Sequence, residues 1–451
     1  MKKNWRRTLA ALTAGALLLS GLVGCSPKTE TTTAASTQSA AAEPAGFEPK
    51  LDTEAAVELS VGSVFGNFEA LDQVINNFNE YYPNVMVSYE QTSGSGKMVE
   101  YLRNNQKVDI IMTDDTNLRY PDWTDYYVRE NCVDLTAAGV DASAMQSDLL
   151  PYCTFDGKLL RIPMGLNLNG IVVNKTLLEK EGLEVPTNYT ELLEACKVLK
   201  QKGYTPIQGP NSAVYGLLAY NMAMTRVGND PALLEALNNG DESAVTAMTE
   251  VFSRLETLKE NGYIDNEINA EYPDDNYDGA ILKFFEGDVP FWVCNTEKVS
   301  GMKKRESKSE SFSADPFEYQ FIYAPMEDDG ADAFVEPWVG FSVNKDAANL
   351  DYAVEFIRFL AQEEQLNTLA SVKGVPAVTT TGTDERYTAI QSPDSAVRSY
   401  VNDGTILNHV KDYFRVEAVD LGNGDAASAE DAAREYVRRC AETAAEMNEE
   451  Q

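Results

Sequence analysis

From residue 58 onward, segments with hydrophobic residues at the spacing of a strand alternate with segments that have them at the spacing of a helix. Short apolar or alternating runs predict strands at Glu58–Val64, Val85–Tyr89 and Val108–Met112. Between the first two strands, apolar residues recur at helical spacing and predict a helix that stops at Pro83; they are Phe68, Leu71, Ile75, Phe78 and Tyr82. A repeated strand–helix–strand order predicts parallel strands joined by helical crossovers, and therefore an α/β domain.

The same alternation restarts near Ile162 and continues through the C-terminal half. Further strands are predicted at Gly170–Val173, Val289–Cys294, Gln320–Tyr323 and Val339–Val343. Helices are predicted at Thr176–Gly182, through Ala213–Gly262, at Tyr352–Val372 as one long helix, and at Ala427–Met447. Another helix, Tyr189–Lys202, should be capped by Thr187 and ended by Gly203. The chain has 451 residues, enough for two such α/β domains.

Composition and charge narrow the classes of partner. Hydrophobic residues make up 43% of the chain, which is typical of a packed globule. The formal net charge is −34, so the protein repels phosphate backbones and nucleic acid is excluded as an expected partner.

The first residues have the pattern of a secretory leader. Lys2, Lys3, Arg6 and Arg7 precede an apolar run from Leu9 to Val23 that is too short to span a bilayer comfortably. The run closes in Leu22-Val23-Gly24-Cys25, which resembles the lipobox of bacterial lipoproteins. This resemblance implies a signal peptide at residues 1–24, lipid (palmitate) on Cys25, and an extracytoplasmic location at the outer face of the cell membrane. The alternative is a plain cleaved signal with a chance cysteine.

The segment after Cys25 is polar and poor in large apolar residues. Ser26–Gly46 consists almost entirely of Ser, Thr, Ala, Gln, Glu and Pro, so it cannot offset its ordering entropy by burial. We therefore expect a flexible tether over residues 25–54.

No metal or cofactor is expected. Five cysteines follow Cys25 without C-x-x-C spacing or a Cys/His cluster, so buried free thiols are the expected state, with an intramolecular disulfide as the alternative. Asp274, Asn276, Asp278 and Gly279 imitate the start of a calcium loop. The position that should hold the closing glutamate is Phe285, so calcium would lose its bidentate ligand.

Several segments, in order, resemble the extracellular solute-binding proteins of bacterial ABC importers, and most closely their carbohydrate-binding branch. These segments are Ile75–Val85, Asp156-Gly157-Lys158 with Ile162-Pro163, Val173-Asn174-Lys175 with Gly182-Leu183, Phe285–Trp292, Tyr323–Met326, Ala353–Leu360 and Gly374-Val375-Pro376. Together they span roughly residues 55 to 380.

This resemblance implies a periplasmic-binding-protein-like fold: two α/β lobes, each a layered, mostly parallel sheet with helices, and a ligand cleft between them. Lobe one would comprise residues 55–165 plus 338–391, and lobe two residues 166–337 plus 392–451. Crossings are expected near Pro163–Asn169, Pro325–Pro337 and Gln391, with closure as a hinge motion. The implied partners are a small solute and the transmembrane subunits of an ABC permease, and the expected state is a monomer.

Ligands of open α/β sheets bind beyond the carboxyl ends of the strands, and this rule selects candidate residues. Aromatic faces would cover the C–H surface of a sugar, and planar polar groups would bind its hydroxyls. The candidates are Phe65 after the first strand, Asp114 and Asp115 after the third, Asn167 and Asn169 at the first crossing, Asn295 and Glu297 after the Trp292 strand, and Trp338. Trp292 is expected in the core, and Tyr413 and Arg415 form a weaker tier.

Two other classes of function compete with solute capture. A glycoside hydrolase needs two placed carboxylates, but among 71 acidic residues some such pair always exists. His409 is the one histidine, and no G-x-S-x-G, H-E-x-x-H or P-loop motif occurs. A surface adhesin, or a sensor partner for a non-sugar solute such as a peptide, polyamine or polyol, remains open, and the acidic candidates leave a cationic ligand as a minor option.

Overall fold

The computed structural model describes residues 46–63, 68–91, 95–104, 108–113, 118–119, 123–210, 213–270, 272, 276–390 and 397–449. Contacts divide the chain into two units, Met1–Phe47 and Glu48–Gln451. The first residues of the second unit are hydrogen-bonded to the helix Leu350–Leu360. Lys50 N donates to Glu355 Oε1 at 2.9 Å, and Arg358 donates to the carbonyl of Glu48 at 2.6 Å. The account below concerns this second unit.

The first sheet of this unit has six strands, five on a main path and one beside it. Its main path runs β12-β11-β3-β1-β2, and β6 also pairs with β11. The strands are β1 (Val57–Ser63), β2 (Val85–Gln91), β3 (Ile110–Thr113), β6 (Ile162–Asn167), β11 (Ala331–Val343) and β12 (Val397–Val401). β1 is parallel to both β2 and β3, which confirms the crossover prediction, whereas β11 runs antiparallel to β3 and β6.

Helices attach to this sheet through amphipathic faces. They are α1 (Glu69–Asn79), α2 (Ser95–Asn104), α3 (Trp123–Asn131), α14 (Leu350–Leu360) and α15 (Glu363–Lys373). α1 turns Leu71, Val74 and Phe78 inward, and Phe78 meets Phe356 of α14 edge to face at 5.2 Å. A small second layer comprises the 3-10 helix Ser147–Cys153 and the hairpin of β4 (Thr154–Phe155) and β5 (Lys158–Leu159).

The second sheet has four strands in the order β10-β7-β9-β8. These are β7 (Asn169–Asn174), β8 (Ile207–Gln208), β9 (Phe291–Asn295) and β10 (Tyr319–Ile322). β7 is antiparallel to β9 and β10, and β8–β9 is the parallel pair. The expectation of mostly parallel pairing is therefore wrong for this sheet, because β10 and β9 return toward β7 from long helical excursions instead of single crossovers.

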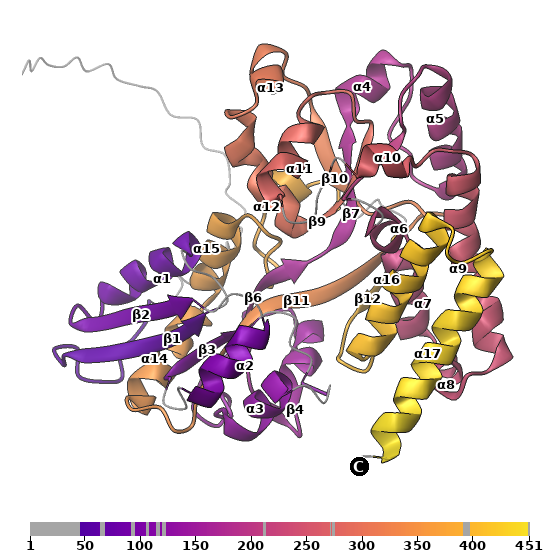
Figure 1. Ribbon diagram of the computed structural model, residues 1–451. Helices are drawn as coiled ribbons and strands as arrows, with labels where there is room; N and C mark the ends of the chain where they lie inside the picture. Colours follow the sequence, from indigo (N-terminus) through magenta and orange to yellow (C-terminus); the bar gives the residue numbers. More distant parts are fainter. Residues whose placement is uncertain are drawn as a thin grey trace, which may run out of the picture. The chain divides into compact units, whose positions relative to one another are not determined.

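A helical layer surrounds the second sheet and holds the largest core. The helices are α4 (Lys175–Lys180), α5 (Tyr189–Gln201), α6 (Ala213–Leu218), α7 (Tyr220–Asn229), α8 (Pro231–Asn239), α9 (Glu242–Glu260), α10 (Asn266–Asn269), α11 (Tyr277–Phe284), α12 (Thr296–Glu306), α13 (Glu310–Ala314), α16 (Asn408–Asn423) and α17 (Ala429–Glu449). In this core Phe252 of α9 stacks on Phe414 of α16, and Tyr436 of α17 meets both rings edge to face. Figure 1 shows α16 and α17 in yellow beside α9.

Two segments pass from one sheet to the other within the described residues. The first crosses at Leu168, between β6 and β7. The second leaves β10 and enters β11, which Figure 1 shows as a long orange strand beside β6. The third expected crossing, near Gln391, falls on residues 391–396, outside the described residues.

Three local predictions differ from the structure. The expected helix Tyr352–Val372 is two helices, since Gln362 has extended backbone (ψ 145°) and serves as the N-cap of α15. Asn188, and not Thr187, caps α5 by accepting from Glu191 N at 3.0 Å, while the Thr187 hydroxyl bonds the Glu191 carboxylate. β11 starts at Ala331 instead of Val339, because Pro337 does not interrupt its pairing with Leu166.

Candidate functional site

The first crossing is fastened to the start of α12 by one buried side chain. The hydroxyl of Thr296 accepts from Leu168 N at 3.1 Å and donates to Leu166 O at 3.2 Å. Thr296 N in turn donates to Leu168 O at 2.9 Å. These bonds fix where β6 ends and β7 begins, and with them the positions of the candidate asparagines.

The predicted asparagines meet at this crossing. Asn169 and Asn295 are paired across β7 and β9, and Asn169 is buried. The carbonyl of Asn169 accepts from Asn221 Nδ2 at 2.8 Å. Asn167 is half-buried, and its Oδ1 lies 3.5 Å from the Thr296 hydroxyl. Asn167, Asn169 and Asn295 therefore lie near one another at the crossing, and their contact with a ligand stays a prediction.

Asn295 and Glu297 also have structural roles at the start of α12. Asn295 is the N-cap of this helix and accepts from Lys298 N at 3.2 Å. The carbonyl of Glu297 accepts from Tyr277 Oη and from Ser300 Oγ, both at 2.6 Å. Sequence reasoning did not find the cap, because Asn295 was considered only as a group beyond the end of a strand.

Trp338 lies on β11 opposite Gly165 and keeps 7% of its surface exposed. Lys373 places its ammonium 5.3 Å from the centre of a Trp338 ring. Burial lowers the pKa of Lys373, while the charge of Glu297 acts to raise it. Trp338, Lys373 and Glu297 thus connect β11, α15 and α12 at the crossing.

Trp292 is a core residue, as predicted. It is 1% exposed and stacks on Phe284 with ring centres 5.5 Å apart. Its position in the middle of β9 turns the indole into the helical layer and away from Asn295.

The backbone beside Trp338 is strained. Val339 has φ +36°, a conformation that costs a β-branched residue about 1–3 kcal/mol. The register on β6 passes from Trp338–Gly165 to Gly340–Pro163. The distortion therefore lies directly before the residues of β11 that also pair with β3. Strain of this kind is typical of hinges and ligand sites.

A polar cluster that the sequence did not predict lies next to Asn167. Glu336, its partner across β6 and β11, accepts from Lys411 Nζ at 2.9 Å and from Asn402 Nδ2 at 2.8 Å. Arg415, from the weaker tier of candidates, stacks on the Tyr220 ring at 4.3 Å. Tyr413, from the same tier, bonds Thr443 of α17 and so belongs to the helical layer.

A cavity of about 320 Å³ opens beside Asn295. We call it the Asn295 pocket; its lining includes Gly216, Leu217, Asn295, Lys298, Arg415 and Val419. Gly216 matters for its shape, because a Cβ there would lie 3.2 Å from the Arg415 backbone and push α6 away from α16.

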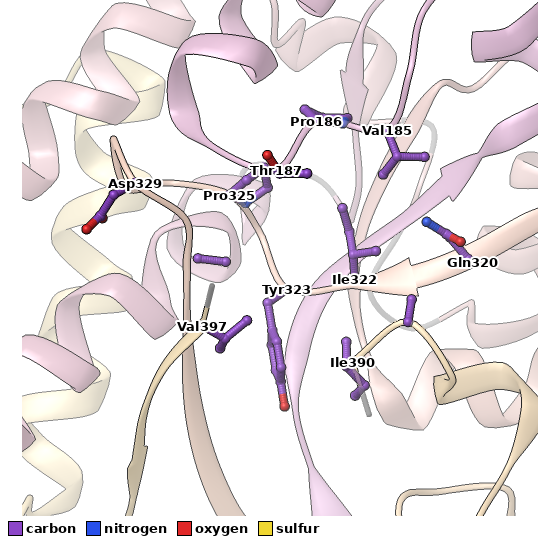
Figure 2. Close-up of a pocket in the computed structure, with 12 residues that line it drawn as sticks. Val185, Pro186, Thr187, Gln320, Ile322, Tyr323, Pro325, Asp329, Ile390 and Val397 are labelled. Carbon is purple, nitrogen blue, oxygen red and sulfur yellow. The ribbon is translucent and has the colours of Figure 1, made fainter. Parts of the chain in front are cut away.

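A larger cavity of about 410 Å³ lies on β10 and contains none of the predicted site residues. Its lining includes Val185, Thr187, Gln320, Tyr323, Ile390 and Val397. Figure 2 shows the Tyr323 ring between Val397 and Ile390, and burial raises the pKa of its hydroxyl. Most of its wall is aliphatic, which gives a polar solute few partners.

Three predicted residues, Phe65, Asp114 and Asp115, lie outside the described residues. The strands that precede them, β1 and β3, are adjacent and parallel, so their carboxyl ends share one edge of the sheet. Ser63 at the end of β1 is buried and donates to Met112 Sδ at 3.4 Å.

The segment that imitates a calcium loop is used for helix capping and ion pairs. Asn276 caps α11 by accepting from Gly279 N at 2.8 Å. Asp278 bonds Arg305 and also pairs with Lys308 at 3.3 Å, and these contacts, Arg305 first, lower its pKa. Within the described ranges, no group of three His, Cys, Asp or Glu side chains could hold a metal ion.

The described part of the chain also contains no helix with the length and hydrophobicity needed to cross a membrane.

Comparisons with known proteins agree with this architecture. The chain is 26% identical over 134 residues to a probable sugar-binding periplasmic protein of Rhizobium meliloti (strain 1021), a match that covers 29% of this chain and 30% of that protein. A putative binding protein of Bacillus subtilis, solved in an open conformation, superposes with a TM-score of 0.66 at 16% identity and covers 87% of this chain and 98% of its own. A Bacillus licheniformis sugar transporter in complex with stachyose gives a TM-score of 0.62 at 20% identity, over 85% of this chain and 100% of that chain.

These superpositions establish the two-lobed α/β fold of solute-binding proteins. The family model for bacterial extracellular solute-binding proteins matches residues 73–390. That span includes the first two crossings, the start of α12 and Trp338. The chain therefore belongs to the family of bacterial extracellular solute-binding proteins, which bind solutes and do not transform them.

Proposed function

We propose that this protein captures a carbohydrate in a cleft between two lobes and delivers it to the transmembrane subunits of an ABC permease. The observation that carries the proposal is the position of these candidates at the crossing between the sheets: Trp338 pairs with Gly165, two residues before Asn167 on β6, and Asn169 pairs with Asn295 directly after the crossing. An indole face covers the C–H surface of a sugar ring, and amides both donate to and accept from hydroxyls. The related protein is described as sugar-binding, and a solved neighbour is in complex with stachyose; both support this ligand class.

The lobes would be those expected from the sequence, residues 55–165 plus 338–391 and residues 166–337 plus 392–451. Closure would bend the chain at Leu168 and at the strained Val339. Phe65, Asp114 and Asp115 would complete the ligand contacts from lobe one, with Glu297 at the start of α12. The protein would act as a monomer anchored outside the cytoplasm by lipid on Cys25, so that Cys25→Ser should move it from the membrane fraction to the medium.

Binding is tested by isothermal titration of the purified protein with mono- and oligosaccharides, amino acids, peptides and polyamines. We expect saturable binding of one saccharide class, weakened about tenfold or more in Trp338→Ala through loss of an aromatic contact. Asn295→Asp retains an oxygen that caps α12 but removes the amide donor, so it should weaken binding without loss of stability. Asn188→Asp makes the same change at the cap of α5 and is the matched control.

The competing functions give different results in the same preparation. Binding of peptides or amines alone would exclude a carbohydrate receptor. Turnover of an oligosaccharide would restore the hydrolase, and an absence of binding by every solute would favour an adhesin or a sensor partner.

A further inference from the structure

The charged side chains that line the Asn295 pocket are both cationic. They are Lys298 of α12 and Arg415 of α16, and the other described lining residues are uncharged. Acidic residues outnumber basic residues 71 to 37 in this protein, so the composition does not favour such a lining.

An aromatic ring supports each cation without neutralising it. The Lys298 ammonium lies 4.6 Å from the centre of the Tyr277 ring, and the Arg415 guanidinium 4.3 Å from that of Tyr220. Both distances are within the range of cation–π attraction. Stacking uses the flat face of a guanidinium, whereas a carboxylate binds the N–H groups in its plane, so Arg415 can do both at once.

The carboxylates near Arg415 are shared with other groups or exposed to solvent. Glu336 attracts Arg415, but its hydrogen bonds come from Lys411 and Asn402. Asp412 lies 3.3 Å from Arg415, but its side chain is 63% exposed, so solvent screens its attraction. Lys298 has no ion pair with any residue that the structure describes. The pocket therefore has a local excess of positive charge.

From this geometry we infer that the solute is an acidic saccharide, whose anionic group binds Lys298 and Arg415 in the Asn295 pocket. This inference rests on the proposed function and adds the charge of the ligand. Leu217 and Val419 form an apolar wall for the C–H face of the sugar ring, and the Asn295 amide is at hand for a hydroxyl. A volume of about 320 Å³ lies at the lower end of the range for ligand pockets and suits a short saccharide.

The inference is tested by titrating full-length purified protein with three matched ligands: a uronic acid disaccharide, its methyl ester and the corresponding neutral disaccharide. Glucuronate, galacturonate and mannuronate disaccharides are each used, and sugar sulfates and sugar phosphates distinguish the carboxylate from other anions. The methyl ester preserves the sugar skeleton and removes the charge. We expect the acid to bind about 10- to 100-fold more tightly than its ester, the range for hydrogen bonds to a charged group. The difference should shrink between about 0.02 M and about 0.5 M salt.

Lys298→Gln should reduce the preference for the acid about tenfold and leave the affinity for the ester unchanged. Lys303→Gln is the matched control on the same helix, because Lys303 is 63% exposed and pairs with Glu306. It should change neither affinity.

The outcomes separate this inference from the proposed function. If a neutral disaccharide binds as tightly as the acid, the proposed function stands and the acidic ligand is refuted. If the acid is preferred equally by wild type and Lys298→Gln, the pocket assignment is wrong. If no saccharide binds, both fail.

Discussion

Lys411 of α16 and Glu336 of β11 form a buried ion pair. Glu336 Oε1 accepts from Lys411 Nζ at 2.9 Å, and 9% of the Lys411 side chain and 15% of the Glu336 side chain remain exposed. Burial acts to raise the pKa of Glu336, but attraction to Lys411 and hydrogen bonds from Lys411 and Asn402 outweigh it. The pKa of Glu336 therefore lies below its usual value.

Lys411→Met should destabilise the protein by about 3 kcal/mol. Removal of one partner of a buried pair typically costs about 3–5 kcal/mol, because an uncompensated charge is left behind. The lower figure applies here since Asn402 still donates at 2.8 Å and Arg415 still attracts the carboxylate. The double variant Glu336→Gln/Lys411→Met should recover most of the loss, because no buried charge remains.

The assay is urea unfolding at several pH values. In wild type the folded pKa of Glu336 is depressed, so its stabilising contribution is present above the unfolded value, about 4.3, and disappears as the pH falls below it. In Lys411→Met burial prevails and raises this pKa, so the deficit should be largest near neutral pH and shrink on acidification. Lys303→Met, which breaks an exposed pair, should change the free energy of unfolding by less than about 1 kcal/mol. A loss below about 1 kcal/mol in Lys411→Met, or a loss that Glu336→Gln does not reverse, would refute the reasoning.

Three further predictions concern the described core. Burial lowers the pKa of His409 to about 4, so ¹³C NMR of this one histidine should give a titration midpoint near that value. The free energy of unfolding should fall as the pH drops from about 6.5 to about 4, because the unfolded state then binds the proton more readily. A midpoint above 6 would contradict this prediction. A thiol reagent should label none of the buried free cysteines in the native protein and all of them in urea; these cysteines are Cys132, Cys153, Cys196, Cys294 and Cys440. Rapid labelling of the native protein would show that the thiols are accessible. Gly340→Ala should cost about 1–3 kcal/mol, measured by urea unfolding, because its Cβ would lie 2.2 Å from Nε of the buried Arg161; an unchanged midpoint would mean that Arg161 moves freely.

Periodicity predicted much of the fold, and its failures have identifiable causes. β1, α1 and β2 follow from strong local patterns, and the five cysteines after Cys25 are buried free thiols, as expected. The break between α14 and α15 was missed because neither Gly nor Pro marks it; Gln362 turns into extended backbone so that α15 can pack on α1. The full length of β11 was missed because Pro337 normally argues against a strand interior.

The candidate site was predicted in part. Asn167 and Asn295 end strands β6 and β9, and Asn169 begins β7; a sequence pattern can locate such strand boundaries. Arg415 of α16 was a candidate of the weaker tier, but Lys298 and Lys373 were not predicted. They stand on different helices, α12 and α15, and tertiary packing alone brings them to the Asn295 pocket and to Trp338. A charge that acquires its role through packing leaves no spacing signal in the sequence.

The measurement that tests the central claim most directly is tryptophan fluorescence of the purified protein during titration with the saccharide panel. The account predicts a saturable change with one saccharide class that disappears in Trp338→Phe, while the core residue Trp292 keeps its emission. A saturable change that persists in Trp338→Phe would contradict the site. Absence of any response, together with absence of heat in titration calorimetry, would contradict carbohydrate binding itself.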